Sequence, residues 1–355
     1  MAQLTLVLPF ALPAPEFAPE LVRALQAPAL AALLSKSSSS RRLPLPAAAR
    51  ALPHELWIAD ALGLSHGDQG LVPGVAAGAM RGFGLDPGDG RWFVVNPTHI
   101  QIARTHLLMG DTRQLDLRED EGRALYDSAR PCFEEAGHAL EYGAADTWFM
   151  RADAWDEIST SSPDAAVGMN LTDWMPSGPP ARAFRKLQNE VQVTWYTHPV
   201  NAEREARGQS AINSFWPWGE ASMATEHANM LVANAGLRSF HPPRLAAWSV
   251  PGWLGALAQE RPARPADVLG KLDGSLLLVC GNVAAPAIAA DWGGWLEQMQ
   301  RLEAELFAPV LERVRAGTVK DLRLVLSHRD GHLETTTTPM AQRKFWRRPT
   351  LESLM

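Results

Sequence analysis

The segment 198–220, HPVNAEREARGQSAINSFWPWGE, constrains the fold more than any other part of the sequence. Its opening His-Pro pair predicts an extended or turn conformation, because a proline ring disfavours helical geometry at the residue before it. The polar run 201–207 is typical of an exposed helix that starts at its asparagine and ends before Gly208. The apolar run 212–218 is too short for a helix and predicts a buried strand. A polar helix followed by a buried strand is typical of an α/β fold.

Apolar runs elsewhere predict a core sheet. Residues 276–280 (LLLVC) are apolar without interruption, as expected for a strand covered on both faces. Residues 4–10 (LTLVLPF) predict a buried first strand that stops at prolines. Near the end of the sequence, residues 322–327 and 332–338 predict a β-hairpin around an Asp-Gly turn. Together these runs predict a mostly parallel sheet with a closing hairpin.

The middle of the sequence has a different pattern. Short, partly alternating runs between residues 92 and 151 are typical of an antiparallel sheet, and 117–136 predicts a helix with charged first turns. This grouping of strands and helices favours a compact α+β unit. Further along, 291–316 predicts the longest helix, with a kink at Pro309.

The N-terminal part contains two segments without a recognised motif. Residues 20–34 show apolar side chains at helical spacing, and 35–42 (SKSSSSRR) is polar and of low complexity, which predicts a mobile linker. The glycine-rich segment 74–87 matches neither common phosphate-binding loop pattern. It predicts a helix of small residues that packs closely on a sheet and ends in a turn.

The composition argues against several classes of function. A formal net charge of −6 gives no general attraction for nucleic acid or anionic membranes. No run of 18 apolar residues predicts a membrane span, and the apolar start lacks the basic region of a signal peptide. Cys132 and Cys280 stand in no metal-binding or redox spacing. We therefore expect a cytoplasmic protein without nucleic-acid or membrane partners.

Carboxylates and imidazoles near the end of the sequence are the weak candidates for metal ligands. They are Asp291, His328, Asp330 and His332, with His227 and His241 as more distant additions. A turn at Asp330 more commonly directs such side chains into solvent. The sequence therefore assigns no metal ligand and no catalytic residue.

Two other polar groups are candidates for binding. Asn201, Arg204 and Arg207 could hold a phosphate or carboxylate at a helix N-terminus, where free N–H groups and the helix dipole favour anions. The alternative for these residues is a solvated helix with internal ion pairs such as Glu203–Arg207. The second group, which could line a cleft or have a structural role, is Asn96, His99 and Gln101.

Three segments resemble the archaeal type of cofactor-independent phosphoglycerate mutase, a member of the alkaline-phosphatase-like superfamily. The most specific is HPVNAEREARG at 198–208 with NSFWPWG at 213–219, and the other two are DLREDEGRAL at 116–125 and DWGGWL…LFAPVL at 291–311. The chain is also similar to a derived bacterial group, the RpfE-type regulatory proteins, in NPTH at 96–99 and FWRR at 345–348.

The resemblance implies an alkaline-phosphatase-like α/β fold, in which a mostly parallel sheet flanked by helices is interrupted by an inserted α+β domain. On this basis we expect three regions. Residues 1–97 would form the first part of the α/β core and 98–200 the inserted domain. Residues 201–355 would form the second part of the core, with the C-terminal hairpin and a basic tail.

The resemblance also implies chemistry that this sequence does not preserve. The superfamily uses two divalent metals held by Asp and His, which activate a serine nucleophile and stabilise both oxygens of an in-line transfer. Here the first strand ends in Leu-Pro-Phe at 8–10, where an Asp ligand is expected, and the nucleophile region holds Val and Ala at 75–76. Asn282 and the sequence SHRD at 327–330 stand where further metal ligands are expected. The mutase chemistry is therefore expected to be lost.

Two hypotheses of different classes follow. The first is a non-catalytic phosphoglycerate-mutase-like protein with a regulatory or binding role, no cofactor, and a protein partner or a small phosphorylated ligand. The second is a metal-dependent phosphomutase or phosphatase with relocated ligands and two divalent ions such as Mn or Zn. The second predicts hydrolysis of a phosphate ester that is lost when His328 is replaced by alanine.

Overall fold

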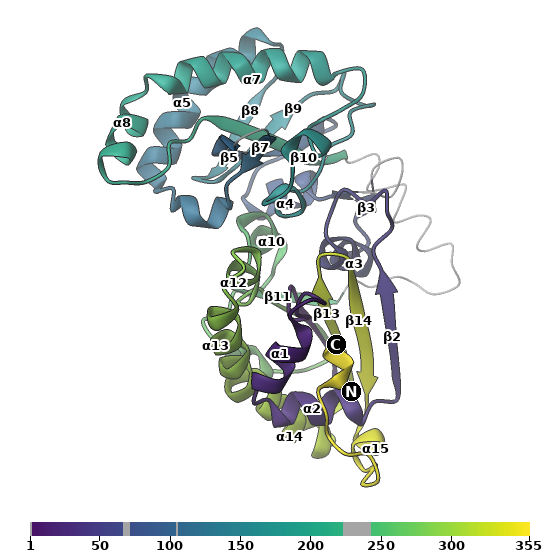
Figure 1. Cartoon of the computed structure of the whole chain (residues 1–355). Coiled ribbons are helices and arrows are strands. Elements are labelled where there is room, and N and C mark those ends of the chain that lie inside the picture. Colours follow the sequence, from purple (N-terminus) through teal and green to yellow (C-terminus); the bar gives the residue numbers. More distant parts are fainter. Residues whose placement is uncertain (1, 67–71, 104–105, 223–242) are drawn as a thin grey trace. The chain divides into compact units, whose positions relative to one another are not determined.

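The structure, a computed structural model, describes residues 2–66, 72–103, 106–222 and 243–355 (Figure 1). The chain splits into two compact units. Unit 1 comprises Met1–Ala47, Leu52–Ile58 and His241–Met355, and unit 2 comprises Ala48–Ala51 and Ala59–Phe240. Unit 2 contains the range 98–200 and extends beyond it, and an inserted domain over 98–200 stays a prediction.

Unit 1 is built on a six-stranded sheet with the strand order β11-β12-β1-β13-β14-β2. The first four strands in this order are parallel, and β14 and β2 continue the sheet in antiparallel pairs. The strands are β1 (Ala2–Leu8), β2 (Ser39–Pro44), β11 (Arg244–Trp248), β12 (Ser275–Cys280), β13 (Val319–His328) and β14 (Gly331–Thr337). The predicted mostly parallel sheet and closing hairpin are thus confirmed.

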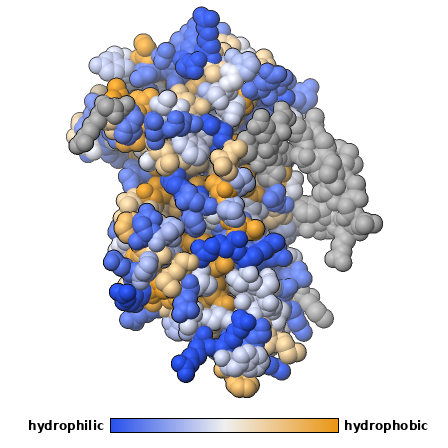
Figure 2. All heavy atoms as spheres, turned by 45° about the vertical axis from the view of Figure 1, so that its right-hand side comes forward, coloured by the Kyte–Doolittle hydropathy of each residue, from blue (hydrophilic) through white to orange (hydrophobic). Residues whose placement is uncertain are grey.

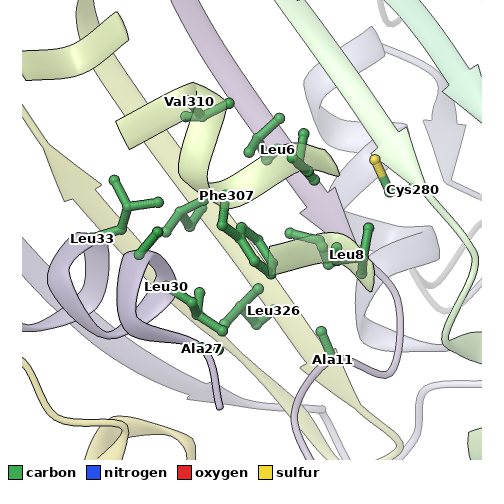
Figure 3. Close-up of a cluster of buried hydrophobic side chains, with 14 of the residues drawn as sticks. Leu6, Leu8, Ala11, Ala27, Leu30, Leu33, Cys280, Phe307, Val310 and Leu326 are labelled. Carbon is green, nitrogen blue, oxygen red and sulfur yellow. The ribbon is translucent and has the colours of Figure 1, made fainter. Parts of the chain in front are cut away.

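Helices flank this sheet and complete the core of unit 1. They are α1 (Ala18–Ala24), α2 (Pro28–Ser35), the first part of α3 (Pro53–Leu62), which ends in unit 2, α10 (Gly252–Leu257), α11 (Pro265–Leu269), α12 (Ala284–Ile288), α13 (Trp292–Leu302), α14 (Ala308–Arg315) and α15 (Pro339–Gln342). In Figure 3 the ring of Phe307 lies among Leu30 and Leu33 of α2 and the strand residues Leu8 and Leu326. Burying side chains of this size stabilises the fold by roughly 1.5–3 kcal/mol each.

The longest predicted helix is interrupted where a proline was expected to disturb it. A π-helical turn, Glu303–Phe307, separates α13 from α14, and Pro309 occupies the first turn of α14. Proline has no backbone N–H and is tolerated in the first turn of a helix, so the interruption accommodates it. The turn also directs Phe307 into the core.

Unit 2 contains a four-stranded antiparallel sheet with the order β10-β5-β9-β8. The strands are β5 (Arg91–Thr98), β8 (Leu140–Ala144), β9 (Thr147–Arg151) and β10 (Ser214–Ser222), and the short pairs are β3 (Ser65–His66) with β4 (Pro73–Gly74) and β6 (Ile100–Ala103) with β7 (His106–Met109). The helices are α4 (Ala76–Gly82), α5 (Glu119–Glu135), α6 (Pro163–Ala166), α7 (Ala181–Tyr196) and α8 (Pro199–Ala206). Buried aromatic rings join α5 and α7 to the sheet, as in the edge-to-face contact of Trp148 with Trp195.

Two predictions for the N-terminal part are wrong in detail. The segment 20–34 is not one helical stretch, because Pro28 starts a second helix, α2, after α1 has ended. The segment 35–42 is not a linker, because its second half belongs to β2, which pairs with β14. β2 is polar because it is the exposed edge of the sheet, where polar and charged side chains are common.

The segment 198–220 forms a helix and a strand, as predicted, but the helix starts earlier. α8 begins at Pro199, and His198 caps it by accepting a hydrogen bond from Val200 N–H at Nδ1 over 3.3 Å. Proline is favoured at the first helical position because it has no N–H to leave unpaired. Gly208 follows the last turn with a φ of 72°, as its predicted position requires.

Candidate functional site

The turn that follows β1 is strained and firmly held. Phe10 has a φ of 58°, a conformation that costs a residue with a bulky side chain about 1–3 kcal/mol. Its N–H donates to Ser327 Oγ over 3.2 Å, and its carbonyl accepts from Trp295 Nε1 over 2.8 Å. The carbonyl of Ser327 accepts from Leu12 N–H over 3.0 Å. Residues from β13 and α13 therefore fix this turn at the carboxyl end of β1.

Ser327 also joins the turn to α3. Its Oγ lies 3.1 Å from His54 Nδ1, and the imidazole packs edge-on against Phe10 with ring centroids 5.7 Å apart. Since Oγ already accepts from Phe10, its own hydrogen is available for Nδ1. Ser327 is fully buried and His54 is 6% exposed. The pair forms a buried link between three elements of unit 1.

The ends of β11 and β12 are similarly constrained. Ser249, directly after β11, has a φ of 54°. A Cβ on Gly281 would lie 2.1 Å from the Ser249 carbonyl oxygen, so only glycine fits where the two strand ends converge. The next residue, Asn282, has a buried Oδ1 with no hydrogen-bond partner among the described residues. One acceptor at this edge is thus left for a donor from outside the described fold.

These features together define the candidate site, the carboxyl edge of the six-stranded sheet. Ligands of open parallel sheets bind outside the carboxyl ends of the strands, and strained backbone tends to cluster at functional sites. The groups described at this edge are the Ser327 hydroxyl, the His54 imidazole, the Asn282 amide and the thiol of Cys280. Ser327 and His54 are bonded to each other and Cys280 is buried in the core, so among these four groups the Asn282 oxygen is the one without a partner.

The pair of divalent cations implied by the family resemblance does not fit this edge. Such a pair needs carboxylates and imidazoles that converge on it. The imidazole of His54 is bonded to Ser327, and burial raises the pKa of the Cys280 thiol, which disfavours a metal-binding thiolate. Within the described ranges, no group of three or more His, Cys, Asp or Glu side chains could hold a metal ion.

Asp291 has a structural role at the start of a helix. Its Oδ1 accepts from Gly294 N–H over 2.9 Å and so caps α13. A Cβ on Gly294 would lie 2.4 Å from Asp291 Oδ2, so the glycine lets the carboxylate approach the helix end. The cap fixes the start of the helix that carries Trp295 to the turn after β1.

The other weak metal candidates, His328, Asp330 and His332, lie on the hairpin of β13 and β14. In its register, Ser327 faces His332 and His328 faces Gly331, so the two histidines project to opposite faces of the sheet. His328 Nδ1 accepts from Asp330 N–H over 3.1 Å and lies 3.9 Å from the Asp330 carboxylate. Burial lowers the pKa of both histidines. The hairpin does not bring the three side chains to one point.

The predicted anion group in unit 2 is occupied by an internal anion. Arg204 is fully buried and donates through Nη1 to Glu121 Oε2 over 2.7 Å, and Arg207 donates through Nη2 to the other carboxylate oxygen of Glu121. Asn201 is bonded to the backbone: Nδ2 donates to the Trp195 and Ile212 carbonyls, and Oδ1 accepts from Ile212 N–H. The three side chains therefore close the segment 198–213 around a carboxylate of α5.

The ionisation of Glu121 follows from these contacts. Burial alone would raise the pKa of its carboxyl group, but hydrogen bonds from the Arg118 backbone and from Arg204 outweigh burial, and the pKa lies below its usual 4.5. Glu121 is 2% exposed. The carboxylate is therefore charged at neutral pH and tightly shared by the arginines.

The residues predicted to line a cleft are not a group in the structure. Asn96 is buried, accepting from Trp218 Nε1 over 2.8 Å and donating to the Asp146 carbonyl over 2.7 Å. His99 Nδ1 donates to the Ala211 carbonyl over 2.8 Å, and Gln101 is exposed on β6. The contacts of Asn96 and His99 join separate segments of unit 2, which matches the structural alternative for these residues.

Sequence reasoning missed the link between His54 and Ser327. The two residues are 273 positions apart, and neither belongs to a motif. The only signal was that Ser327 stands in a place where the resemblance implies a metal ligand. His227 and His241 lie outside the described residues.

Comparisons with known proteins support the fold. No protein-family model matches the sequence, and no curated protein matches it. Among solved structures, the PH0037 protein from Pyrococcus horikoshii is similar, with a TM-score of 0.56 and 12% identity over 100% of this chain and 92% of that one. A cofactor-independent phosphoglycerate mutase from Thermoplasma acidophilum DSM 1728 gives a TM-score of 0.46 and 12% identity, over 100% of this chain and 94% of that one. The first likeness shows a shared fold.

The described helices also bear on the membrane prediction. None of them is long and apolar enough to cross a bilayer.

Proposed function

We propose that the chain is a phosphoglycerate-mutase-like protein that acts by binding and does not transfer phosphate. The main observation behind this proposal is the turn after β1, where the resemblance implies a metal-binding aspartate. That place is taken by Phe10, and the neutral Ser327 closes the turn through two hydrogen bonds. Because Ser327 also bonds to His54, a cation there would have to break the contacts that hold a strained residue.

The unpartnered Oδ1 of Asn282 supports a role in binding. A buried carbonyl oxygen without a partner costs about 1–3 kcal/mol, which a hydroxyl or N–H donor of a ligand would recover. Asn282 follows β12, at the edge where ligands of parallel sheets bind. A small phosphorylated ligand or a segment of a protein partner can supply such a donor.

Metal analysis tests the proposal. The purified full chain is incubated with excess Mn²⁺ or Zn²⁺, dialysed mildly, and assayed for bound metal and for hydrolysis of p-nitrophenyl phosphate. We expect a folded protein without stoichiometric metal and without metal-dependent hydrolysis. Two retained equivalents of metal together with hydrolysis would instead support a metal-dependent phosphomutase or phosphatase.

Two histidine variants separate the outcomes. If hydrolysis occurs, His328→Ala should abolish it under the enzyme hypothesis, whereas His106→Ala, which removes an exposed histidine of β7, should not. A hydrolysis rate that is the same in both variants would count against the enzyme hypothesis, which relies on His328. A metal-dependent rate that only His328→Ala removes would overturn the proposed function.

A further inference from the structure

The C-terminal segment carries an unusual concentration of exposed apolar side chains. Phe345 is 87% exposed and Trp346 is 65% exposed, and their rings contact each other edge-on with centroids 5.1 Å apart. Of the nine large hydrophobic side chains that are exposed in the described part of the chain, four lie in the last sixteen residues: Met340, Phe345, Trp346 and Met355. An apolar group of this kind on a surface indicates an interaction site.

Basic residues surround the two rings. Arg343, Lys344, Arg347 and Arg348 place four cationic residues within six positions of a chain whose formal net charge is −6. The side chains of Arg343 and Arg348 are exposed and have no hydrogen bond or ion pair with the residues that the structure describes. We call residues 343–348 with Met340 the basic aromatic surface. In Figure 2, the lower end of the molecule, where α15 lies in Figure 1, shows strongly hydrophilic residues beside hydrophobic ones.

Hydrogen bonds hold the backbone of this surface in place. Gln342 is buried and donates to the Ala32 carbonyl over 3.2 Å. Lys344 Nζ donates to the Ser37 carbonyl over 2.7 Å, and Arg347 Nη1 donates to the Ser35 carbonyl over 3.2 Å. A surface fixed in advance loses less conformational entropy on binding than a free tail. The two rings are therefore held at fixed positions on the surface, where they are exposed to solvent.

We propose that the basic aromatic surface binds an acidic segment of a protein partner that also carries an apolar side chain. Aromatic residues and arginine are enriched at the centres of protein interfaces, where they contribute most of the affinity. The planar guanidinium groups of Arg343 and Arg348 match carboxylates through paired hydrogen bonds. The ring pair offers an apolar contact between these cations.

An anionic membrane is the other chemistry that attracts basic and aromatic residues. Stable attachment needs several free cations, because each basic residue near the surface contributes about 1 kcal/mol. Here Lys344 and Arg347 are engaged with backbone carbonyls, so the surface offers a bilayer fewer free cations than its sequence suggests. These features favour the protein partner.

This surface is independent of the proposed function. β14 runs antiparallel to β13 and ends at Thr337, which pairs with Leu322 near the amino end of β13. The basic aromatic surface follows directly, so within unit 1 it lies at the amino ends of the parallel strands, opposite the candidate site. Its test stands whether or not the carboxyl edge has catalytic activity.

A peptide array tests the proposal with the full chain. The probes are peptides of about twelve residues that combine Glu and Asp with one or two of Leu, Ile or Phe at varied spacing, and matched peptides with Lys in place of the acids. Vesicles of phosphatidylserine and phosphatidylcholine form a separate arm. We expect the chain to bind a subset of the acidic peptides, more weakly as salt rises from about 50 to about 200 mM because the charges are screened.

Two double variants locate the binding. Phe345→Ala/Trp346→Ala should weaken the peptide affinity at least about tenfold, which corresponds to about 1.4 kcal/mol, and Arg343→Glu/Arg348→Glu should abolish it. The matched controls on α7 are Val193→Ala/Tyr196→Ala, exposed by 73% and 85%, and Arg182→Glu/Arg185→Glu, and both should bind as the unmodified chain does. All substituted side chains are exposed, so folding should persist.

The same experiment can overturn the proposal. The proposal fails if no acidic peptide binds more tightly than its lysine counterpart. It also fails if the double variants of the basic aromatic surface and the α7 controls lose the same amount of peptide affinity. Binding to phosphatidylserine vesicles without binding to any acidic peptide would assign the surface to a membrane and refute the protein partner.

Discussion

The carboxyl edge of unit 1 and the Glu121 cluster of unit 2 (Glu121, Arg204 and Arg207) differ in the kind of contact that holds them together. At the edge, where the resemblance implies metal ions and phosphate, the described contacts of Ser327, His54 and Phe10 are hydrogen bonds and a ring contact. In unit 2, where the sequence offered an external anion site, Arg204 and Arg207 close on the carboxylate of Glu121. The described contacts at the expected site contain no carboxylate, whereas in unit 2 a carboxylate and two guanidinium groups hold the fold together.

The comparison shows that residue types alone do not identify a site. Arginine and asparagine near a helix N-terminus are as suitable for an internal carboxylate as for a phosphate, and burial decides between them. Arg204 is fully buried with its partner, so the pair acts as structure. Among the described residues, the edge keeps an unpartnered acceptor at Asn282 and strained backbone at Phe10, which are features of a binding surface.

The largest expected effect is on the charged cluster. Glu121→Ala leaves the buried guanidinium of Arg204 without its carboxylate, and we expect unit 2 to lose about 3–5 kcal/mol of stability. Hydrogen exchange of peptides from α5 and α8, compared with peptides from β1 and β13, measures each unit separately. Protection should fall in the first pair and persist in the second.

A matched control uses the neighbouring acid. Glu203 is 67% exposed and lies 3.9 Å from Arg207, so Glu203→Ala should change stability by no more than about 0.5 kcal/mol. Equal effects of the two substitutions would mean that the Glu121 cluster is no stronger than a surface ion pair.

A smaller effect is expected at the carboxyl edge. Ser327→Ala removes the acceptor of Phe10 N–H and one hydrogen-bond partner of His54. It leaves the Phe10 N–H without this bond and should cost about 1–3 kcal/mol. Urea unfolding measures this change, with Ser39→Ala on the exposed strand β2 as the control. A loss of 3–5 kcal/mol or more would place the edge on a par with the charged cluster and remove the contrast.

How well the sequence predicted an element depends on how far along the chain its stabilising partners lie. The strands at 276–280 and 4–10 were predictable because an uninterrupted apolar run needs cover on both faces, and β12 and β1 are neighbours in the parallel sheet. The strand β2 was missed because a polar edge strand is stabilised by its partner β14, almost 300 residues further along.

The site depended still more on distant contacts. The sequence suggested a pair between Glu203 and Arg207, four residues apart, and the structure contains it at 3.9 Å. The stronger partner, Glu121, is 86 positions from Arg207 and was visible only as part of a charged helix start. Local spacing gives local pairs, whereas the contacts that decide the roles of Arg204 and Ser327 arise only from the folded chain.

The smallest expected effect concerns pH. The folded pKa of Glu121 lies below its usual 4.5, so the unfolded chain takes up a proton first as pH falls. The stabilisation from the carboxylate is therefore complete above that usual value and is lost as pH falls through the folded pKa. The measurement is the difference in unfolding free energy between the unmodified chain and Glu121→Gln from pH 7 to pH 3. Effects of histidines, which both variants share, cancel in this difference. The difference in unfolding free energy should stay constant down to about pH 4.5 and then shrink. A difference that grows as the pH falls would mean that burial raises the pKa of Glu121 and that the arginines do not stabilise its charge.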